Sequence, residues 1–158
     1  MLYTTWNIIF FTVWSLNINS PRISFLTNTY KYTLSPQHYL YSSAYSNFAS
    51  GNYVDAISNL NEISKKITST DYYILLGLCY EKTGNLIQSE QALQNAVKLL
   101  PGRFKPKYYL MEFYLRHNID ATTICYDIIE TPVKVVSKEI IYLKESANKY
   151  INLKKTKS

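Results

Sequence analysis

The chain has 158 residues, of which 47% are hydrophobic and 18% charged, and it carries a formal net charge of +6. This length suits one ordinary domain, and the chain is too apolar and aromatic to be a disordered tail. Its two cysteines cannot build a disulfide framework, and their spacing predicts no zinc site. The 16 tyrosines are an excess that fits either a binding surface or a compositional bias.

The first 21 residues carry no charged side chain, and residues 2–18 are apolar and aromatic. As a helix they would extend about 25 Å, which is less than the ~30 Å hydrocarbon core of a bilayer. Three interpretations stay open: a marginal membrane span, a segment packed on the domain, and the remnant of a longer membrane protein. Pro21 ends any such helix, and we expect residues 22–35 to form a linker or a degenerate helix.

An internal repeat organises the middle of the chain. Its clearest copy begins at Tyr73 with the pattern Y-x2-L-G-x2-Y and continues through Gly84-Asn85 to Pro101. Gly51-Asn52 precedes, and Asn118 follows, the Gly84 turn at nearly the same spacing. The pattern resembles the tetratricopeptide repeat (TPR), a helix–turn–helix unit of about 34 residues. This resemblance implies an all-α right-handed helical-hairpin solenoid of about three helix pairs.

The physical role of each repeated slot supports this interpretation. A small residue such as Gly77 lets the first helix approach the second closely, and a large apolar residue such as Leu93 fills the gap between them. In the third copy the same spacing places Thr123 in a small slot and Asp127 in a large apolar slot. Met111 occupies the position of Gly77, so we expect the third pair to pack differently.

A final helix is expected to cap the repeats. Apolar residues recur at helical spacing over residues 136–153, and Ser137 is a candidate N-cap. The TPR-like domain is therefore expected to cover residues 36–153, and residues 154–158 are expected to be a basic tail. Terminal repeats are often atypical because one face must meet solvent or a cap.

Two short runs carry a narrower resemblance. Residues 101–110 read PGRFKPKYYL and residues 132–135 read PVKV. Both runs resemble the C-terminal TPR tail of O-antigen ligase and polymerase-like membrane proteins. The resemblance implies an accessory or truncated part of such a membrane glycan-ligase system, because the active residues of the family lie in its membrane part. It also implies a bacterial, membrane-associated location with the repeats in an aqueous compartment; a cytoplasmic location is the alternative.

The residues give no support for catalysis. His38 and His117 fall in different repeat copies, and neither lies at a spacing that specifies a nucleophile and its base. The glycines are isolated, so no phosphate-binding loop is predicted. We therefore expect no enzymatic activity, no cofactor and no metal.

Stacked helix pairs present an extended concave surface that binds proteins or peptides. The repeat register places nine candidate groove residues there: Tyr41, Tyr45, Phe48, Glu81, Lys82, Lys105, Tyr108, Glu112 and Arg116. Tyrosine and arginine are prominent in interface energetics, and the cations could hold a partner's carboxylate, although neighbouring acids weaken that field.

Positive charge concentrates in residues 98–116 and 131–158. These stretches fit a solvated surface, an anionic membrane or nucleic acid. No groove-reading motif accompanies them, so a basic nucleic-acid binder is the least favoured interpretation.

Overall fold

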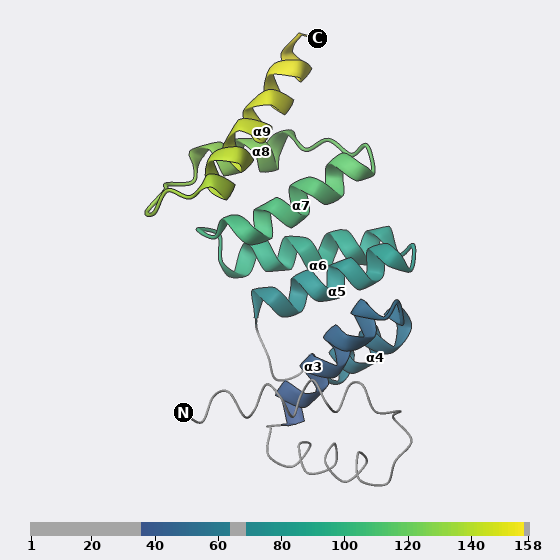
Figure 1. Ribbon diagram of the computed structural model, residues 1–158. Coiled ribbons are helices and arrows are strands. Elements are labelled where there is room, and N and C mark those ends of the chain that lie inside the picture. Colours follow the sequence, from purple (N-terminus) through teal and green to yellow (C-terminus); the bar gives the residue numbers. More distant parts are fainter. Residues whose placement is uncertain (1–35, 64–68, 157–158) are drawn as a thin grey trace, which may run out of the picture. The chain divides into compact units, whose positions relative to one another are not determined.

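The computed structural model describes residues 36–63 and 69–156 (Figure 1). Residues 41–158 form one compact unit, and residues 1–40 form a separate unit. The apolar segment 1–21, the expected linker 22–35 and the last two residues of the basic tail lie outside the described residues. Everything below therefore concerns the repeat unit.

The described residues form seven helices and no strand. The helices are α3 (Pro36–Ala49), α4 (Tyr53–Ile63), α5 (Thr70–Lys82), α6 (Leu86–Leu99), α7 (Phe104–Arg116), α8 (Thr122–Glu130) and α9 (Lys138–Lys155). In Figure 1, α5, α6 and α7 lie stacked in chain order, and α8 and α9 follow them. Three helix pairs followed by one further helix confirm the predicted all-α, TPR-like solenoid class. None of the helices described is both long and apolar enough to cross a membrane.

The turns inside the pairs adopt the predicted backbone conformation. Gly51, Gly84 and Asn118 have φ angles of 82°, 80° and 53°, in the left-handed region that favours glycine and tolerates asparagine. The residue after each of them donates its N–H to a carbonyl five residues earlier, at 2.8 to 2.9 Å. This bond is the Schellman arrangement that satisfies the last carbonyls of a helix.

The third pair departs from the predicted register. Thr123 is exposed and Asp127 only half-buried, whereas Ile124 and Ile128 are buried. The turn after Asn118 is longer, and α8 begins four residues beyond it. The assignment of Thr123 and Asp127 to buried slots was therefore wrong, because α6 begins two residues after Gly84 and the longer turn of the third pair shifts the buried positions along the chain.

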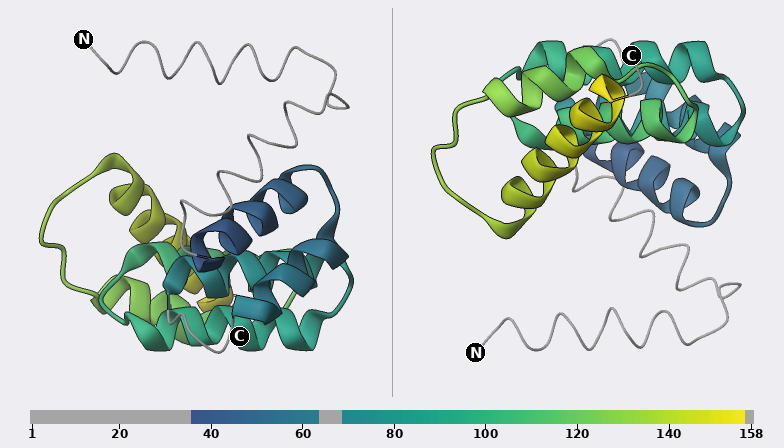
Figure 2. Two further views of the ribbon diagram at one scale, coloured as in Figure 1. Left: turned by 90° about the horizontal axis from the view of Figure 1, so that it is seen from below. Right: turned by 90° about the horizontal axis from the view of Figure 1, so that it is seen from above.

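The cap helix completes the core. Leu143, Ala147 and Ile151 of α9 join one apolar cluster with residues of α6, α7 and α8. As predicted, Ser137 caps α9, since its hydroxyl accepts a hydrogen bond from the Ile140 N–H at 3.3 Å. The helix runs to Lys155, into the segment expected to be a tail. Seen from above in Figure 2, α9 crosses the end of the helix stack at an angle.

Candidate partner-binding surface

The nine predicted groove residues lie on the first helices of the three pairs. We call the surface that these helices share the first-helix surface. Helix α3 carries Tyr41, Tyr45 and Phe48; α5 carries Glu81 and Lys82; α7 carries Lys105, Tyr108, Glu112 and Arg116. Tyr45 is 61% exposed and Tyr108 is 39% exposed. Large aromatic area is therefore open to solvent on two of these helices.

One cluster forms where α5 and α7 begin. The Lys105 ammonium lies 2.6 Å from Asp71 Oδ1, and both side chains are more than half exposed. Burial raises the pKa of the nearby Tyr41 hydroxyl; the Asp71 carboxylate raises it further and Lys105 opposes the change. The structure thus places the predicted Tyr41 and Lys105 within electrostatic reach of one another and of Asp71, an acid of the intervening helix.

A second cluster forms where the same two helices end. Arg116 donates through Nε and Nη2 to the two carboxylate oxygens of Glu81, at 2.9 and 3.0 Å. His117 Nε2 lies 2.9 Å from the same carboxylate, and Glu112 lies 3.6 Å from Arg116. Burial raises the pKa of Glu81, but the hydrogen bonds from Arg116 and His117 outweigh it and lower the pKa below its ordinary value. His117 was missed as a member of this group, although it directly follows Arg116.

Two of the three predicted cations of this surface are therefore already engaged. Lys105 and Arg116 each bind an acid of the neighbouring α5, one at either end of the helices. Lys82 is exposed on the last turn of α5. The rings of Phe48 and Tyr53 pack edge to face at the α3–α4 turn, with 5.6 Å between their centroids. Tyr45, Tyr108 and Lys82 are therefore exposed, and Lys105 and Arg116 are exposed but bound to acids.

Much of the remaining positive charge is also structural. Lys107 is 1% exposed, and its ammonium donates to Asp127 Oδ1 at 2.8 Å, to the Asp127 carbonyl and to the Thr131 hydroxyl. Lys144 of α9 donates to the Ile129 and Thr131 carbonyls, both at 2.8 Å. The two ammonium groups thus neutralise the carbonyl end of α8, where the helix dipole favours cations.

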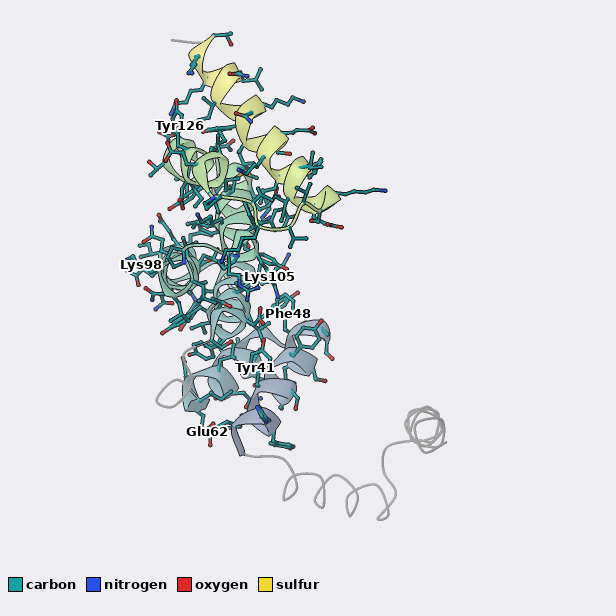
Figure 3. All side chains as sticks on the ribbon, turned by 90° about the vertical axis from the view of Figure 1, so that its left-hand side faces the viewer. Tyr41, Phe48, Glu62, Lys98, Lys105 and Tyr126 are labelled. Carbon is teal, nitrogen blue, oxygen red and sulfur yellow. The ribbon has the colours of Figure 1, made fainter. Side chains whose placement is uncertain are left out.

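Two exposed lysines of the first basic stretch lie apart from one another. Lys98 and Lys105 lie on different sides of the stacked helices (Figure 3). Lys105 is in addition paired with Asp71.

Helix α9 contributes to a groove that the sequence interpretation missed. A groove of about 640 Å³ is lined by Phe104, Lys105 and Tyr108 of α7 and by Lys138, Glu139, Ile140, Tyr142 and Leu143 of α9. Residues 136–153 had been interpreted only as a cap. Tyr142 could have indicated the groove in the sequence, because it is an aromatic residue outside the apolar stripe of α9. In the structure Tyr142 is 68% exposed.

The thiols of the repeat unit are not activated. Cys79 and Cys125 are fully buried, and burial raises the pKa of each to about 11. A thiolate nucleophile requires a lowered pKa and access to solvent. Within the described ranges, no three His, Cys, Asp or Glu side chains are grouped so that they could hold a metal ion.

Comparison with known proteins finds similarity at the level of fold. No family model matches the chain, and no curated protein matches it. Among solved structures, it is similar to the Sgt2 TPR domain from Aspergillus fumigatus, with 16% identity and a TM-score of 0.58. The match covers 75% of this chain and 81% of that one. The TPR-like fold is thus shown, while the link to O-antigen ligase-like proteins rests on the two sequence runs alone.

Proposed function

We propose that this chain is a non-catalytic interaction module that binds a protein or peptide ligand on its first-helix surface. The observation that carries the proposal is the exposure of Tyr45 and Tyr108 on first helices, while Tyr72 of α5 is 2% exposed. An exposed tyrosine offers large rigid area with a polar end and dominates many interfaces. A TPR-like fold supports a binding role, because such repeats present extended surfaces to proteins and peptides.

The electrostatics favour a protein partner over nucleic acid. Binding to phosphates releases counterions only where cations are available to replace them. Lys105, Lys107 and Arg116 of the first basic stretch all hold carboxylates of this chain. A polyanion would have to compete with each of these pairs.

The test is partner recovery by a double variant, Tyr45→Ala with Tyr108→Ala, in pull-downs from the source cell. We expect recovery of the partner to fall about tenfold or more, as for other aromatic interface anchors. Tyr126→Ala is the matched control, since Tyr126 is 42% exposed on the second helix α8. Equal recovery by the wild type and the double variant would place the binding site elsewhere.

A narrower form of the proposal specifies the class of partner and the cellular location. The resemblance of residues 101–110 and 132–135 to the tails of O-antigen ligase-like proteins favours a partner in a membrane glycan-ligase system, and so a membrane-associated location. In this form the chain affects glycan transfer only through the membrane enzyme. Crosslinking of the wild type and of the double variant in membranes of the source cell tests it. Partners that include no such ligase would remove this narrower form and leave the interaction module intact.

A further inference from the structure

Helix α9 lies at the end of the stack, and only one of its sides is buried (Figure 1). Leu143, Ala147 and Ile151 form that buried side. On the opposite side, exposed residues recur at alternating steps of four and three along the helix and its C-cap: Lys138, Tyr142, Glu145, Lys149, Asn152 and Thr156. We call this side the outer face of α9. A spacing of 3.5 residues is typical of helices that pack side by side along their length.

The outer face and its edges also expose apolar area. Tyr142 is 68% exposed, Leu153 54% and Ile141 46%. An open groove of about 470 Å³ follows the second half of the helix, and its lining comes from α9 alone: Glu145, Asn148, Lys149, Asn152, Leu153 and Thr156. The groove thus lacks an opposite wall, which a second helix laid along α9 would supply.

The two charges in the middle of the outer face are not paired within the described part of the chain. Its ion pairs, at N–O distances up to 4 Å, include neither Glu145 nor Lys149. Their spacing of four residues would allow a pair within the helix, but the structure does not form it. Both side chains are exposed. An acid and a base on one face are therefore open to a partner that carries the opposite charges in the reverse order.

A second copy of α9 carries those charges in that order when the two helices run antiparallel. A two-fold axis level with Ala147 places Glu145 opposite Lys149 of the second copy, and Lys149 opposite its Glu145. In a parallel arrangement Glu145 would meet Glu145 and Lys149 would meet Lys149, and such like-charge contacts are unfavourable. The charge pattern therefore selects both the occupant and its direction.

The same antiparallel register brings apolar area together. It places Ile141 opposite Leu153 and Tyr142 opposite Asn152 of the second copy, and each contact occurs twice in a symmetric pair. We infer that the chain self-associates as an antiparallel two-fold dimer through the outer face of α9. This dimer is separate from the proposed partner binding, because Tyr45 lies on α3 and is not part of the outer face. A dimer presents two first-helix surfaces and so favours partners with two binding sites.

Sedimentation equilibrium of the full chain, between about 1 µM and 1 mM, measures the association. One helix from each copy, about 27 Å long, forms a small interface, so we expect a Kd of about 100 µM and a monomer at a few micromolar. The test variants are Glu145→Lys and Lys149→Glu, because each sets like charges against one another in the dimer. The matched controls are Glu62→Lys on α4 and Lys98→Glu on α6, at exposed residues of other helices. Circular dichroism at 222 nm verifies that each variant is folded.

Each single charge reversal should weaken the association about tenfold, and Tyr142→Ala severalfold, with both controls within about twofold of the wild type. An equimolar mixture of Glu145→Lys and Lys149→Glu should associate again, because one variant then offers two bases and the other two acids. The inference is overturned by a wild type that stays monomeric up to about 1 mM, by single reversals that leave the association unchanged, or by a mixture that stays monomeric. None of these outcomes bears on partner recovery through Tyr45, which the pull-down tests separately.

Discussion

The second and third helix pairs follow one repeat pattern but solve the packing between their helices by different means. In the second pair, Gly77 presents no side chain, and its carbonyl accepts a hydrogen bond from the buried Ser89 hydroxyl at 2.8 Å. In the third pair, Met111 takes the place of that glycine and is buried, and the ammonium of Lys107 is buried close by on the same helix. One pair achieves contact by close approach, and the other by filling the space with long side chains.

The difference shows how a helical repeat accommodates a buried charge. An ammonium group has three N–H donors, and Lys107 finds three acceptors on Asp127 and Thr131. Because the acceptors lie at the end of α8, the charge also meets the negative end of a helix dipole. The cost of burying the ammonium is offset locally, so the third pair keeps the fold of the second without its glycine.

The largest expected effect is on the buried lysine. Lys107→Ala should lower the free energy of unfolding by about 3 kcal/mol, because it leaves a cavity and removes the partner of the Asp127 and Thr131 acceptors. The measurement is urea unfolding followed by circular dichroism at 222 nm. Lys105→Ala is the matched control two residues away. Its ion pair is exposed, so the change should stay within about 1 kcal/mol.

Lys107→Met separates packing from hydrogen bonding. Methionine restores most of the volume of the lysine but none of its donors, and we expect a loss of about 1–2 kcal/mol. A Met variant as stable as the wild type would mean that the polar contacts of Lys107 contribute nothing net. Equal losses in Lys105→Ala and Lys107→Ala would contradict the contrast between the exposed and the buried lysine.

The next effect concerns the close approach in the second pair. A Cβ atom added at Gly77 would lie 2.8 Å from Leu93 Cγ and 2.9 Å from its Cδ2, and Leu93 is fully buried. We expect Gly77→Ala to destabilise by about 2 kcal/mol, since the clash outweighs the roughly 1 kcal/mol that alanine gains in helix propensity. Gly102→Ala is the control, because nothing lies within 4 Å of its added Cβ. Stabilisation by Gly77→Ala would show that the two helices can separate without cost.

The sequence predicted the parts of the fold that depend on local pattern. Positive φ at Gly51, Gly84 and Asn118 and the N-cap at Ser137 were all deduced from residue type and spacing. The buried slots of α8 were not, because the longer turn after Asn118 shifts them without changing the repeat signature.

The ion pairs between helices could not be predicted from the sequence. The repeat register placed Lys105 and Arg116 on a shared surface but gave no indication that Asp71 and Glu81 hold them. Such pairs depend on the crossing of α5 and α7, which hydrophobic spacing does not specify. The α7–α9 groove escaped notice for the same reason, because it depends on the angle at which the cap helix leaves α8.

A smaller effect is expected where the long turn of the third pair meets the cap. The Tyr150 hydroxyl accepts a hydrogen bond from the Ala121 N–H at 3.1 Å and so ties α9 to the start of α8. Tyr150→Phe should cost about 1 kcal/mol, the net value of one such bond. Tyr142→Phe, on the exposed side of α9, should have no measurable effect. Equal unfolding midpoints for both variants would show that the hydroxyl does not contribute to docking of the cap.

The smallest effect is a pH dependence at the ion pair that joins the second and third pairs. The folded state lowers the pKa of Glu81 from its ordinary value of about 4.3, so its contribution is present above that pH and is lost as the pH falls through the lowered pKa. Glu81→Gln should therefore be less stable than the wild type by about 1 kcal/mol at pH 7. The gap between the two proteins should narrow at about pH 3.

Glu145→Gln is the control for this pH dependence, because Glu145 is exposed on α9. Its difference from the wild type should be near zero at both pH values. A gap for Glu81→Gln that stays constant between the two pH values would mean that the amide loses packing or hydrogen bonds and not charge. The bond between Arg116 and Glu81 would then join the second and third pairs by its geometry alone, as the buried Ser89 hydroxyl joins the two helices of the second pair.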